Sequence, residues 1–162
     1  MKPYHFNLFY DLNYPIDSYT RIGWDEYFLL IAASVSIRST CKYYSSGAVI
    51  VKDNRIVSTG YNGNPKDKPH CLECGCALFD AGYDFNSHLE LCTAVHAVQN
   101  AIISARSEDM INSKIYIVKY DKQKNEFIIS DICVLCKNMC KNAKIKEYII
   151  GDLNNKIIHK EI

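Results

Sequence analysis

The sequence predicts a single α/β domain in which a mixed β-sheet packs against helices. The chain has 162 residues, which is enough for one domain with one hydrophobic core. Hydrophobic residues make up 48% of it and charged residues 23%, a composition typical of globular proteins rather than disordered ones. Helical and strand-like patterns alternate in the order helix, hairpin, helix, strand, helix, strand, which favours a sheet covered by helices.

The N-terminal part of the chain divides into an arm and a helix. Residues 1–22 are rich in Tyr, Asn and Pro and predict an irregular arm, which leaves residues 23–162 for the domain. The first helix is expected from Trp24 to about Arg38. Its apolar residues recur every three or four positions, and two acidic residues lie in the first turn, where the helix dipole favours negative charge.

The middle of the chain begins with a hairpin and then becomes irregular. Two β-rich runs between Gly47 and Gly60 flank Asp53-Asn54, a pair typical of a hairpin turn. Residues 60–65 predict a loop. Residues 66–90 lack a regular pattern and are expected to be irregular.

The second half predicts helices and strands in alternation. The expected elements are a helix from near Cys92 through Ala105, a strand at Ile115 to Val118, a polar turn at Asp121 to Asn125, a return strand at Phe127 to Ile129, a helix at Cys136 to Ala143 and a strand at Tyr148 to Ile150.

Eight cysteines are the most informative part of the composition. Six fall into two groups, with three histidines near the first: Cys71, Cys74 and Cys76, and Cys133, Cys136 and Cys140. Residues 1–15 lack the apolar stretch of a secretory signal, and a chain of this length does not depend on disulfides. Clustered Cys and His in such a chain indicate zinc in a reducing, cytoplasmic compartment.

The pair Cys133 and Cys136 has the C-x₂-C spacing of zinc ligands and opens a predicted helix. His96 lies near the start of the preceding predicted helix and would add an imidazole. Two thiolates and one imidazole leave the fourth tetrahedral position open, which is typical of catalytic zinc. On spacing alone, a histidine that only satisfies a helix end accounts for His96 equally well.

Several motifs in one order carry a resemblance to a known family. They are Arg38-Ser-Thr-Cys41, Gly47-Ala-Val-Ile-Val51, Ser58-Thr-Gly-Tyr-Asn-Gly63, His70-Cys71, Gly75-Cys76, His96-Ala97 with Gln99-Asn100-Ala101-Ile102, and Cys133-x-x-Cys136. Over about residues 24 to 150 the chain resembles the zinc-dependent deoxycytidylate deaminases, a branch of the cytidine deaminase-like superfamily. The resemblance implies an α/β/α sandwich with a mixed sheet of about five strands and zinc held between two helix N-termini.

The resemblance also implies a reaction, the hydrolytic deamination of dCMP to dUMP. In this class zinc activates the water that attacks C4 of cytosine, and a glutamate that is not a ligand carries the protons. On matching positions, His96, Cys133 and Cys136 would bind the zinc, Asn62 would contact the sugar, and the backbone at Ala97 would face the pyrimidine. Family members associate through the face that carries these helices, so a homo-oligomer is expected.

The chain departs from the family at the residue that carries protons. The family motif is His-Ala-Glu, and here it is His96-Ala97-Val98. An isopropyl group can neither accept nor donate a proton. Gln99 does not titrate and lies about 100° round the helix from position 98, and Glu90 precedes the helix. The sequence therefore predicts an impaired or inactive enzyme; drift of the chain and an engineered knockout both account for Val98.

Three lesser departures concern the surroundings of the site. Ile132 stands where the family has proline before the first cysteine. The stretch Lys119 to Ile129 predicts an extra hairpin near the site. The chain ends soon after Ile150, so the family's usual C-terminal strand and helix are expected to be absent or reduced.

The other cysteines predict a second, structural zinc. Some phage-type members hold such a zinc with a cysteine after the first helix, a cysteine after the Gly-Tyr-Asn-Gly loop and residues just before the catalytic histidine. By that resemblance the ligands are Cys41, Cys71, His88 and Cys92, with Cys74 or Cys76 as alternatives. A closed four-ligand site would fix the loop 66–90. Reduced core thiols are the other interpretation, and Cys140 is assigned to packing.

Three functions remain open on this sequence. The chain is a zinc protein that binds a cytosine nucleotide without turnover, an active nucleotide deaminase with a substitute acid or base, or a structural zinc module. Val98 favours the absence of turnover, whereas Asn62 and the open zinc position favour a pocket that binds.

Charge and hydropathy argue against nucleic acid and membranes as partners. Lys+Arg number 19 and Asp+Glu 18, so the net charge is +1, which argues against nucleic acid as a partner. Five lysines could still form a local basic rim that binds nucleic acid, although an ordinary solvated surface is the simpler interpretation. They are Lys66, Lys68, Lys119, Lys122 and Lys124. No apolar run reaches the ~18 residues of a membrane helix, so no membrane is expected.

Overall fold

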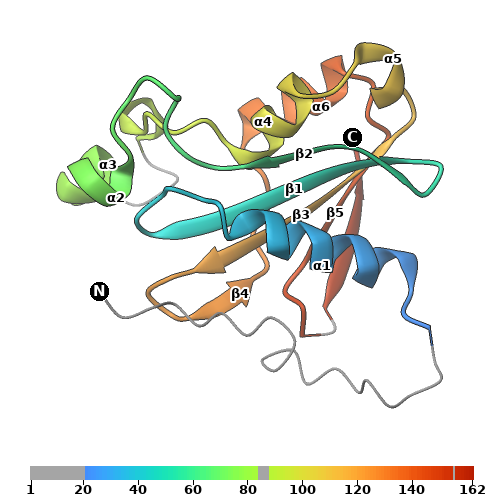
Figure 1. The fold of residues 1–162 in the computed structure, drawn as a ribbon, viewed down its shortest axis with the longest axis horizontal. Helices are drawn as coiled ribbons and strands as arrows, with labels where there is room; N and C mark the ends of the chain where they lie inside the picture. Colours follow the sequence, from blue (N-terminus) through green and yellow to red (C-terminus); the bar gives the residue numbers. More distant parts are fainter. Residues whose placement is uncertain (1–20, 84–87, 155) are drawn as a thin grey trace.

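The computed structural model describes residues 21–83, 88–154 and 156–162, and it is built on one mixed sheet (Figure 1). The predicted N-terminal arm lies outside the described residues except for its last two. The sheet has six strands, and five follow the order β2-β1-β3-β5-β6 while β4 pairs with β3. Their bounds are β1 (Tyr44–Lys52), β2 (Arg55–Tyr61), β3 (Lys114–Asp121), β4 (Glu126–Ile128), β5 (Glu147–Gly151) and β6 (Ile157–Glu161). Only the pairing of β3 with β5 is parallel among these strands.

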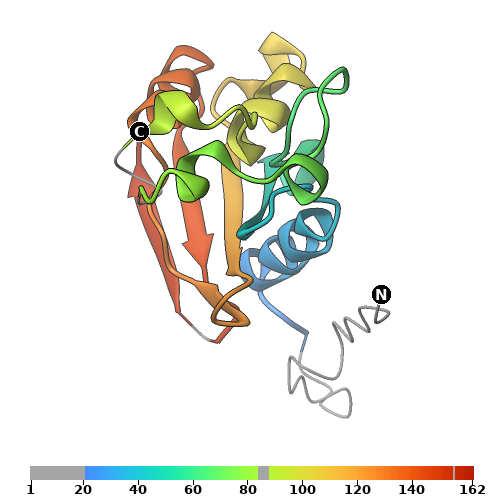
Figure 2. The ribbon, with the colours of Figure 1, turned by 90° about the vertical axis from the view of Figure 1, so that its left-hand side faces the viewer.

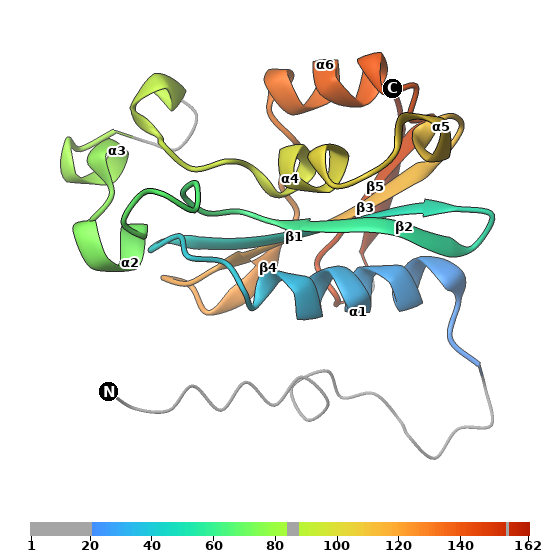
Figure 3. The same ribbon diagram turned by 45° about the horizontal axis from the view of Figure 1, so that its top comes forward.

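Helices cover both faces of the sheet, as the predicted sandwich requires. Helix α1 (Trp24–Ser36) lies on one face, and α4 (Ala97–Ile103) and α6 (Val134–Asn142) lie on the other (Figure 3). Each layer has its own core because alternate strand residues point to opposite faces. Phe28 and Leu29 of α1 lie in one core, and Ala101 of α4 and Cys140 of α6 lie in the other.

Two glycines let the helices approach the sheet closely. A Cβ atom at Gly47 of β1 would collide with the backbone of α1 at Ala32. A Cβ atom at Gly60 of β2 would collide with the backbone of α4 at Ala97 and Ala101. The position of α4, and therefore of the residue at its start, depends on the absence of a side chain at Gly60.

Both predicted hairpins are confirmed. Strands β1 and β2 are joined by Asp53 and Asn54, whose φ angles of 50° and 59° are those of a tight two-residue turn. Strands β3 and β4 form the extra hairpin, with Asp121 opposite Glu126.

The segment before α4 differs from its prediction. The expected helix from Cys92 begins only at Ala97, because Val95 exchanges two backbone hydrogen bonds with Gly63 and His96 has an extended conformation. Upstream, the segment predicted as irregular holds two short helices, α2 (Cys71–Cys74) and α3 (Ala77–Asp80), and a 3₁₀ turn at Leu89–Leu91. It projects at the left of Figure 1 and faces the viewer in Figure 2.

The C-terminus and one short helix complete the fold. The C-terminal strand was expected to be absent or reduced, but β6 is present and pairs with β5 along its whole length. Helix α5 (Ser107–Met110) connects α4 to β3. Among the described residues, no helix combines the length and the apolar character needed to cross a membrane.

Candidate metal centre and nucleotide pocket

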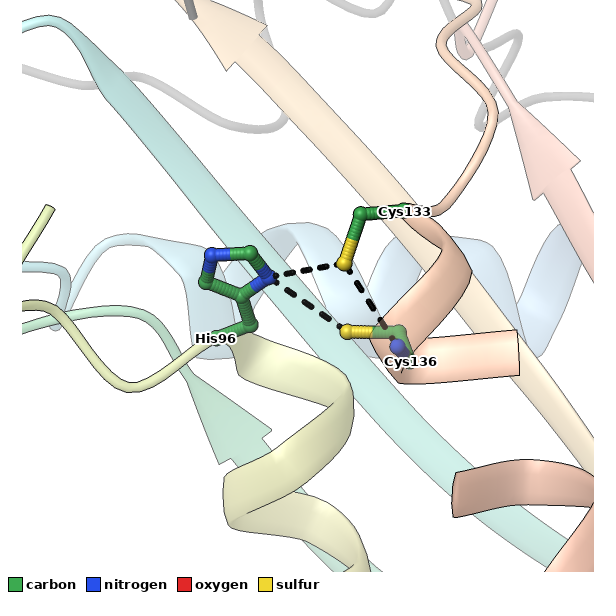
Figure 4. A group of neighbouring side chains, drawn as sticks. All are labelled: His96, Cys133 and Cys136. Carbon is green, nitrogen blue, oxygen red and sulfur yellow. Dashed lines mark hydrogen bonds between the residues drawn. The ribbon is translucent and has the colours of Figure 1, made fainter. Parts of the chain in front are cut away.

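Two helix starts bring three ligand side chains to one point. His96 is the N-cap residue of α4, Cys133 is the N-cap residue of α6, and Cys136 lies in the first turn of α6 (Figure 4). The Nδ1 atom of His96 lies 3.4 Å from the Sγ atom of each cysteine. The Cys136 backbone N–H donates to Cys133 Sγ at 3.5 Å, which orients that sulfur at the helix end.

This arrangement fits a tetrahedral zinc ion. With Zn–S near 2.3 Å and Zn–N near 2.0 Å, tetrahedral geometry separates sulfur and nitrogen by about 3.5 Å. The observed separations are 3.4 Å, and all three ligand atoms lie within 4.8 Å of one another. No other group of three such ligands meets that limit in the described part of the chain.

The protonation of the three ligands is set by burial. Burial, and then the positive charge of Lys119, lower the pKa of His96, so its imidazole stays neutral and keeps a lone pair for a metal. Burial, and then the nearby Cys133, raise the pKa of the Cys136 thiol. A bound cation reverses this second effect because it stabilises the thiolates.

A pocket in front of the ligands contains the predicted substrate-binding residues. Asn62, Ala97 and Val98 line it together with the triad. The Asn62 side chain accepts the Ser46 backbone N–H at 2.7 Å and donates to the Tyr44 carbonyl at 3.0 Å. These two bonds fix the amide against β1 and leave it one N–H and one lone pair for a ligand.

Val98 is a buried part of the pocket wall, with 3% of its surface exposed. The two nearby polar residues do not replace the missing carboxylate. The Gln99 side chain accepts the His96 backbone N–H at 2.8 Å and so caps α4. Glu90 is exposed and pairs with His88, and it does not line the pocket.

Sequence reasoning did not assign Lys119, Ser130 and Asp131 to the site. Lys119 was expected only on a basic rim, yet it lines the pocket, with its Nζ 4.1 Å from the centre of the Tyr44 ring and 3.4 Å from Ser130 Oγ. Burial lowers the pKa of Lys119. The extra hairpin predicted over Lys119 to Ile129 was the sequence signal that could have found them. It folds the chain back on itself, so that Ser130 lies beside Lys119 at the pocket.

The predicted second metal site is a loose group of thiols. Cys41, Cys71 and Cys76 are buried and Cys92 is half-buried. Burial and the neighbouring thiols, Cys41 first, raise the pKa of Cys71 to about 11. Burial also raises the pKa of Cys92, and the neighbouring thiols Cys41 and Cys76 add to this effect. In the described residues, however, no three ligand atoms of this group lie within 4.8 Å of one another, so the thiols are neighbours without forming a closed set.

His88 has other partners than these thiols. Its Nδ1 lies 2.8 Å from the Glu90 carboxylate, and its ring lies 4.0 Å from that of Tyr83. Its side chain is 43% exposed. Cys74 is exposed as well, whereas Cys140 is fully buried in the core, where packing was predicted.

The sequence of this chain is similar to those of known proteins. Residues 22–152 match the family model described as the cytidine and deoxycytidylate deaminase zinc-binding region. The deoxycytidylate deaminase of Mycobacterium phage D29 is 35% identical over 133 residues, which cover 80% of this chain and 95% of that protein. ComE operon protein 2 of Bacillus subtilis is 32% identical over 102 residues, covering 62% of this chain and 50% of that protein.

A solved structure supports the fold. The dCMP deaminase of cyanophage S-TIM5 superposes with a TM-score of 0.56 at 22% identity, covering 81% of this chain and 84% of that one. The family model matches residues 22–152, a range that includes His96, Cys133 and Cys136, and the D29 relative covers 80% of the chain. This chain therefore belongs to the cytidine and deoxycytidylate deaminase zinc-binding family.

Proposed function

We propose that this chain is a zinc protein of the deoxycytidylate deaminase type that binds a cytosine nucleotide but deaminates it very slowly or not at all. One observation carries the proposal. The complete ligand triad and the pocket are present, but position 98 of the pocket wall holds a buried valine. Binding and proton transfer thus depend on different residues, and the residue for proton transfer is missing.

Metal binding, sugar binding and proton transfer depend on different residues of the chain. His96, Cys133 and Cys136 would hold one zinc ion, which when bound acidifies a water and polarises the ligand. Asn62 offers its remaining hydrogen-bonding capacity to a sugar hydroxyl. Val98 offers no group to move a proton, and the absence of a positioned acid–base group typically costs about 10²- to 10⁴-fold in rate.

The ligand class follows from relatives and from charge. The matching proteins from phage D29 and from Schizosaccharomyces pombe are named deoxycytidylate deaminase, and the S-TIM5 enzyme has been solved with dCMP and dUMP. The near-neutral net charge of +1 favours a small nucleotide over nucleic acid. Thiols that stay reduced, as zinc ligands must, favour a reducing, intracellular compartment.

The test is to measure binding and turnover on the same zinc-loaded sample. Calorimetry should show saturable binding of dCMP, and an ammonia assay should show no release above the uncatalysed rate. Ready release of ammonia would mean that another residue replaces the glutamate. Failure to bind dCMP at millimolar concentration would instead indicate a structural zinc module.

We also infer a second, structural zinc held by Cys41, Cys71, Cys92 and Cys76. Support comes from the nearby thiols that raise the pKa of Cys71 and of Cys92, and from the place of these cysteines around a segment with only short helices. Zinc would have to draw the sulfurs together, because no three of them lie within 4.8 Å of one another. Cys76 replaces His88 in this set because His88 pairs with Glu90. We expect two zinc ions per chain, and one after Cys71→Ser. A stoichiometry of one in the unmodified chain, with Cys41 and Cys71 freely alkylated, would contradict the second site.

An oligomer is also proposed. Apolar side chains are exposed on the layer of α4 and α6, with Ile103 70%, Val134 65% and Leu135 55% exposed. Burying such side chains against a second copy would remove them from water. Light scattering at micromolar concentration should give at least a dimer, and a monomer would contradict the proposal.

A further inference from the structure

Asp131 lies two residues before the ligand Cys133 and accepts four hydrogen bonds through its carboxylate. Its Oδ1 atom accepts the Tyr148 hydroxyl and the Ile132 backbone N–H, each at 2.8 Å. Its Oδ2 atom accepts the ammonium groups of Lys137 and Lys160, each at 2.9 Å. Hydrogen bonds between ionised groups are the stronger ones in proteins, but the Asp131 side chain is 39% exposed, so water weakens each ion pair and the four bonds order this carboxylate together.

The three side-chain donors come from three different elements. Tyr148 belongs to β5, Lys160 to β6 and Lys137 to α6. Tyr148 and Lys160 are direct partners in the β5–β6 pairing, so their side chains rise from the same point of the sheet. The carboxylate of Asp131 therefore connects the sheet edge, the C-terminal strand and the first turns of the helix that carries both cysteine ligands.

Strand β6 is itself fixed on the opposite face. The neighbouring residue His159 places its Nε2 3.1 Å from the Asp25 carboxylate of α1 and its Nδ1 against Glu147 of β5. Successive strand residues thus bind opposite layers, His159 the α1 layer and Lys160 the segment before α6. Because of this double attachment, β6 is a fixed support rather than a free chain end.

We propose that Asp131 is a positioning residue for the metal centre, which holds Cys133 in place through β5, β6 and α6. Cys133 lies at a junction of loop and helix, and it is only half-buried, so its own packing does not fix it. The Asp131 bonds hold the preceding segment so that Cys133 Sγ faces His96 Nδ1 at 3.4 Å. The inference rests on the zinc site of His96, Cys133 and Cys136. Partners that orient a ligand typically change metal affinity by about 10- to 100-fold.

The experiment compares metal binding by Asp131→Ala, Asp131→Asn and the unmodified full-length chain. Zinc affinity is measured by chelator competition, and the geometry by the thiolate and ligand-field bands of the cobalt(II) form. Asp131→Ala should weaken zinc binding at this site by about 10-fold or more and alter the cobalt bands. Asp131→Asn keeps an oxygen acceptor and should recover part of the loss. Cys133→Ala gives the reference for metal bound elsewhere.

A pair of lysine variants controls for general destabilisation. Lys160→Met should weaken zinc binding in the same direction, whereas Lys156→Met, at an exposed lysine of the same C-terminal segment, should not. Unchanged zinc affinity and cobalt bands in Asp131→Ala, with only a lower melting temperature, would show a purely structural role and overturn the proposal. Absence of metal from the unmodified chain would overturn the proposal and the metal site together.

Discussion

On the proposed function, position 98 determines which step the pocket can perform. Val98 is 3% exposed and lies two residues after His96. A buried apolar wall can contact the flat face or edge of a base, but it offers no hydrogen bond to a water or an amine. On the proposed function, substrate binding and metal binding would therefore persist here while the proton path is interrupted.

The ligand assignment gives the first prediction. Cys133→Ala removes one of three donors and should lose the zinc bound at this site, because a single histidine and a single thiolate do not complete a zinc site. Metal analysis of the purified variant checks this. Cys140→Ala is the matched control on the same helix, since Cys140 is buried in the core and outside the triad. Full zinc content in Cys133→Ala would exclude Cys133 as a ligand.

Spacing predicted the Cys133 and Cys136 pair, and the resemblance to the deaminases added His96, but neither predicted the residues that support the triad. The C-x₂-C pair could be found because a short spacing at a helix start is visible in a sequence, whereas His96 lies 37 residues before Cys133. Asp131 could not, because its partners Tyr148 and Lys160 lie 17 and 29 residues away and meet it only through the β5–β6 register. The Ile132 N–H that Asp131 binds would be missing if position 132 held proline.

Among the elements, α4 is the one whose placement matters most to the site. It has only seven residues, and it packs against β2 at Gly60 without an intervening side chain. A Cβ atom there would push the backbone at Ala97 away, and His96 would move with it. The close contact is thus part of the metal site although Gly60 touches no ligand.

Gly60→Ala tests this dependence and is the second prediction. The free energy of unfolding should fall by about 1–3 kcal/mol, because overpacking shifts the backbone, and zinc affinity should fall several-fold. Chemical denaturation and chelator competition measure the two effects. Thr59→Ala, at the exposed neighbouring position, is expected to leave zinc affinity unchanged. Wild-type zinc affinity in Gly60→Ala would show that α4 can adjust without moving His96.

Helices and strands could be predicted where the local sequence pattern determines their bounds. They could not be predicted where contacts between distant residues determine them. Helix α1 and the β1–β2 hairpin follow from periodicity and from Asp53-Asn54, and both are confirmed. The start of α4 was predicted too early because Val95 is drawn into a bridge with Gly63. Strand β6 was missed because its pairing with β5 and its charged contacts, not its five residues, define it.

At the scale of the whole molecule, charged side chains join α1 to the strands β3, β5 and β6 on one face of the sheet. Asp25 of α1 accepts the Tyr116 hydroxyl of β3 at 2.8 Å and also contacts His159 of β6. His159 continues to Glu147 of β5, which pairs with Lys114 at 3.0 Å. The network crosses from helix to the sheet edge, so it should contribute to the stability of the complete fold.

Glu147 gives the third prediction, on pH. Burial disfavours its charge, but hydrogen bonds from His159 and Lys114 outweigh burial and lower the pKa of Glu147 below 4.5. A carboxyl group whose pKa is lowered by folding stabilises the fold at any pH above its pKa in the unfolded chain. That contribution is lost as the pH falls through the pKa of the folded state. The free energy of unfolding should therefore fall more steeply below pH about 4.5 in the unmodified chain than in Glu147→Gln.

Denaturation measured from pH 7 to pH 3 checks the slope. Glu161→Gln is the control, because Glu161 lies opposite Glu147 in the β5–β6 pair and is exposed. At pH 7, Glu147→Gln should be less stable by about 1 kcal/mol, as expected for a partly exposed charge network. Identical slopes in Glu147→Gln and the unmodified chain would exclude Glu147 as the source.

On the proposed function, Val98 alone separates this zinc centre from an active deaminase, and Val98→Glu tests this most directly. Both the unmodified chain and the variant are loaded with zinc and assayed for ammonia release from dCMP. The variant should exceed the unmodified chain by about 10³-fold, within the range for a positioned acid–base group. Rapid release by the unmodified chain, or inactivity of both proteins despite bound zinc and dCMP, would contradict the claim.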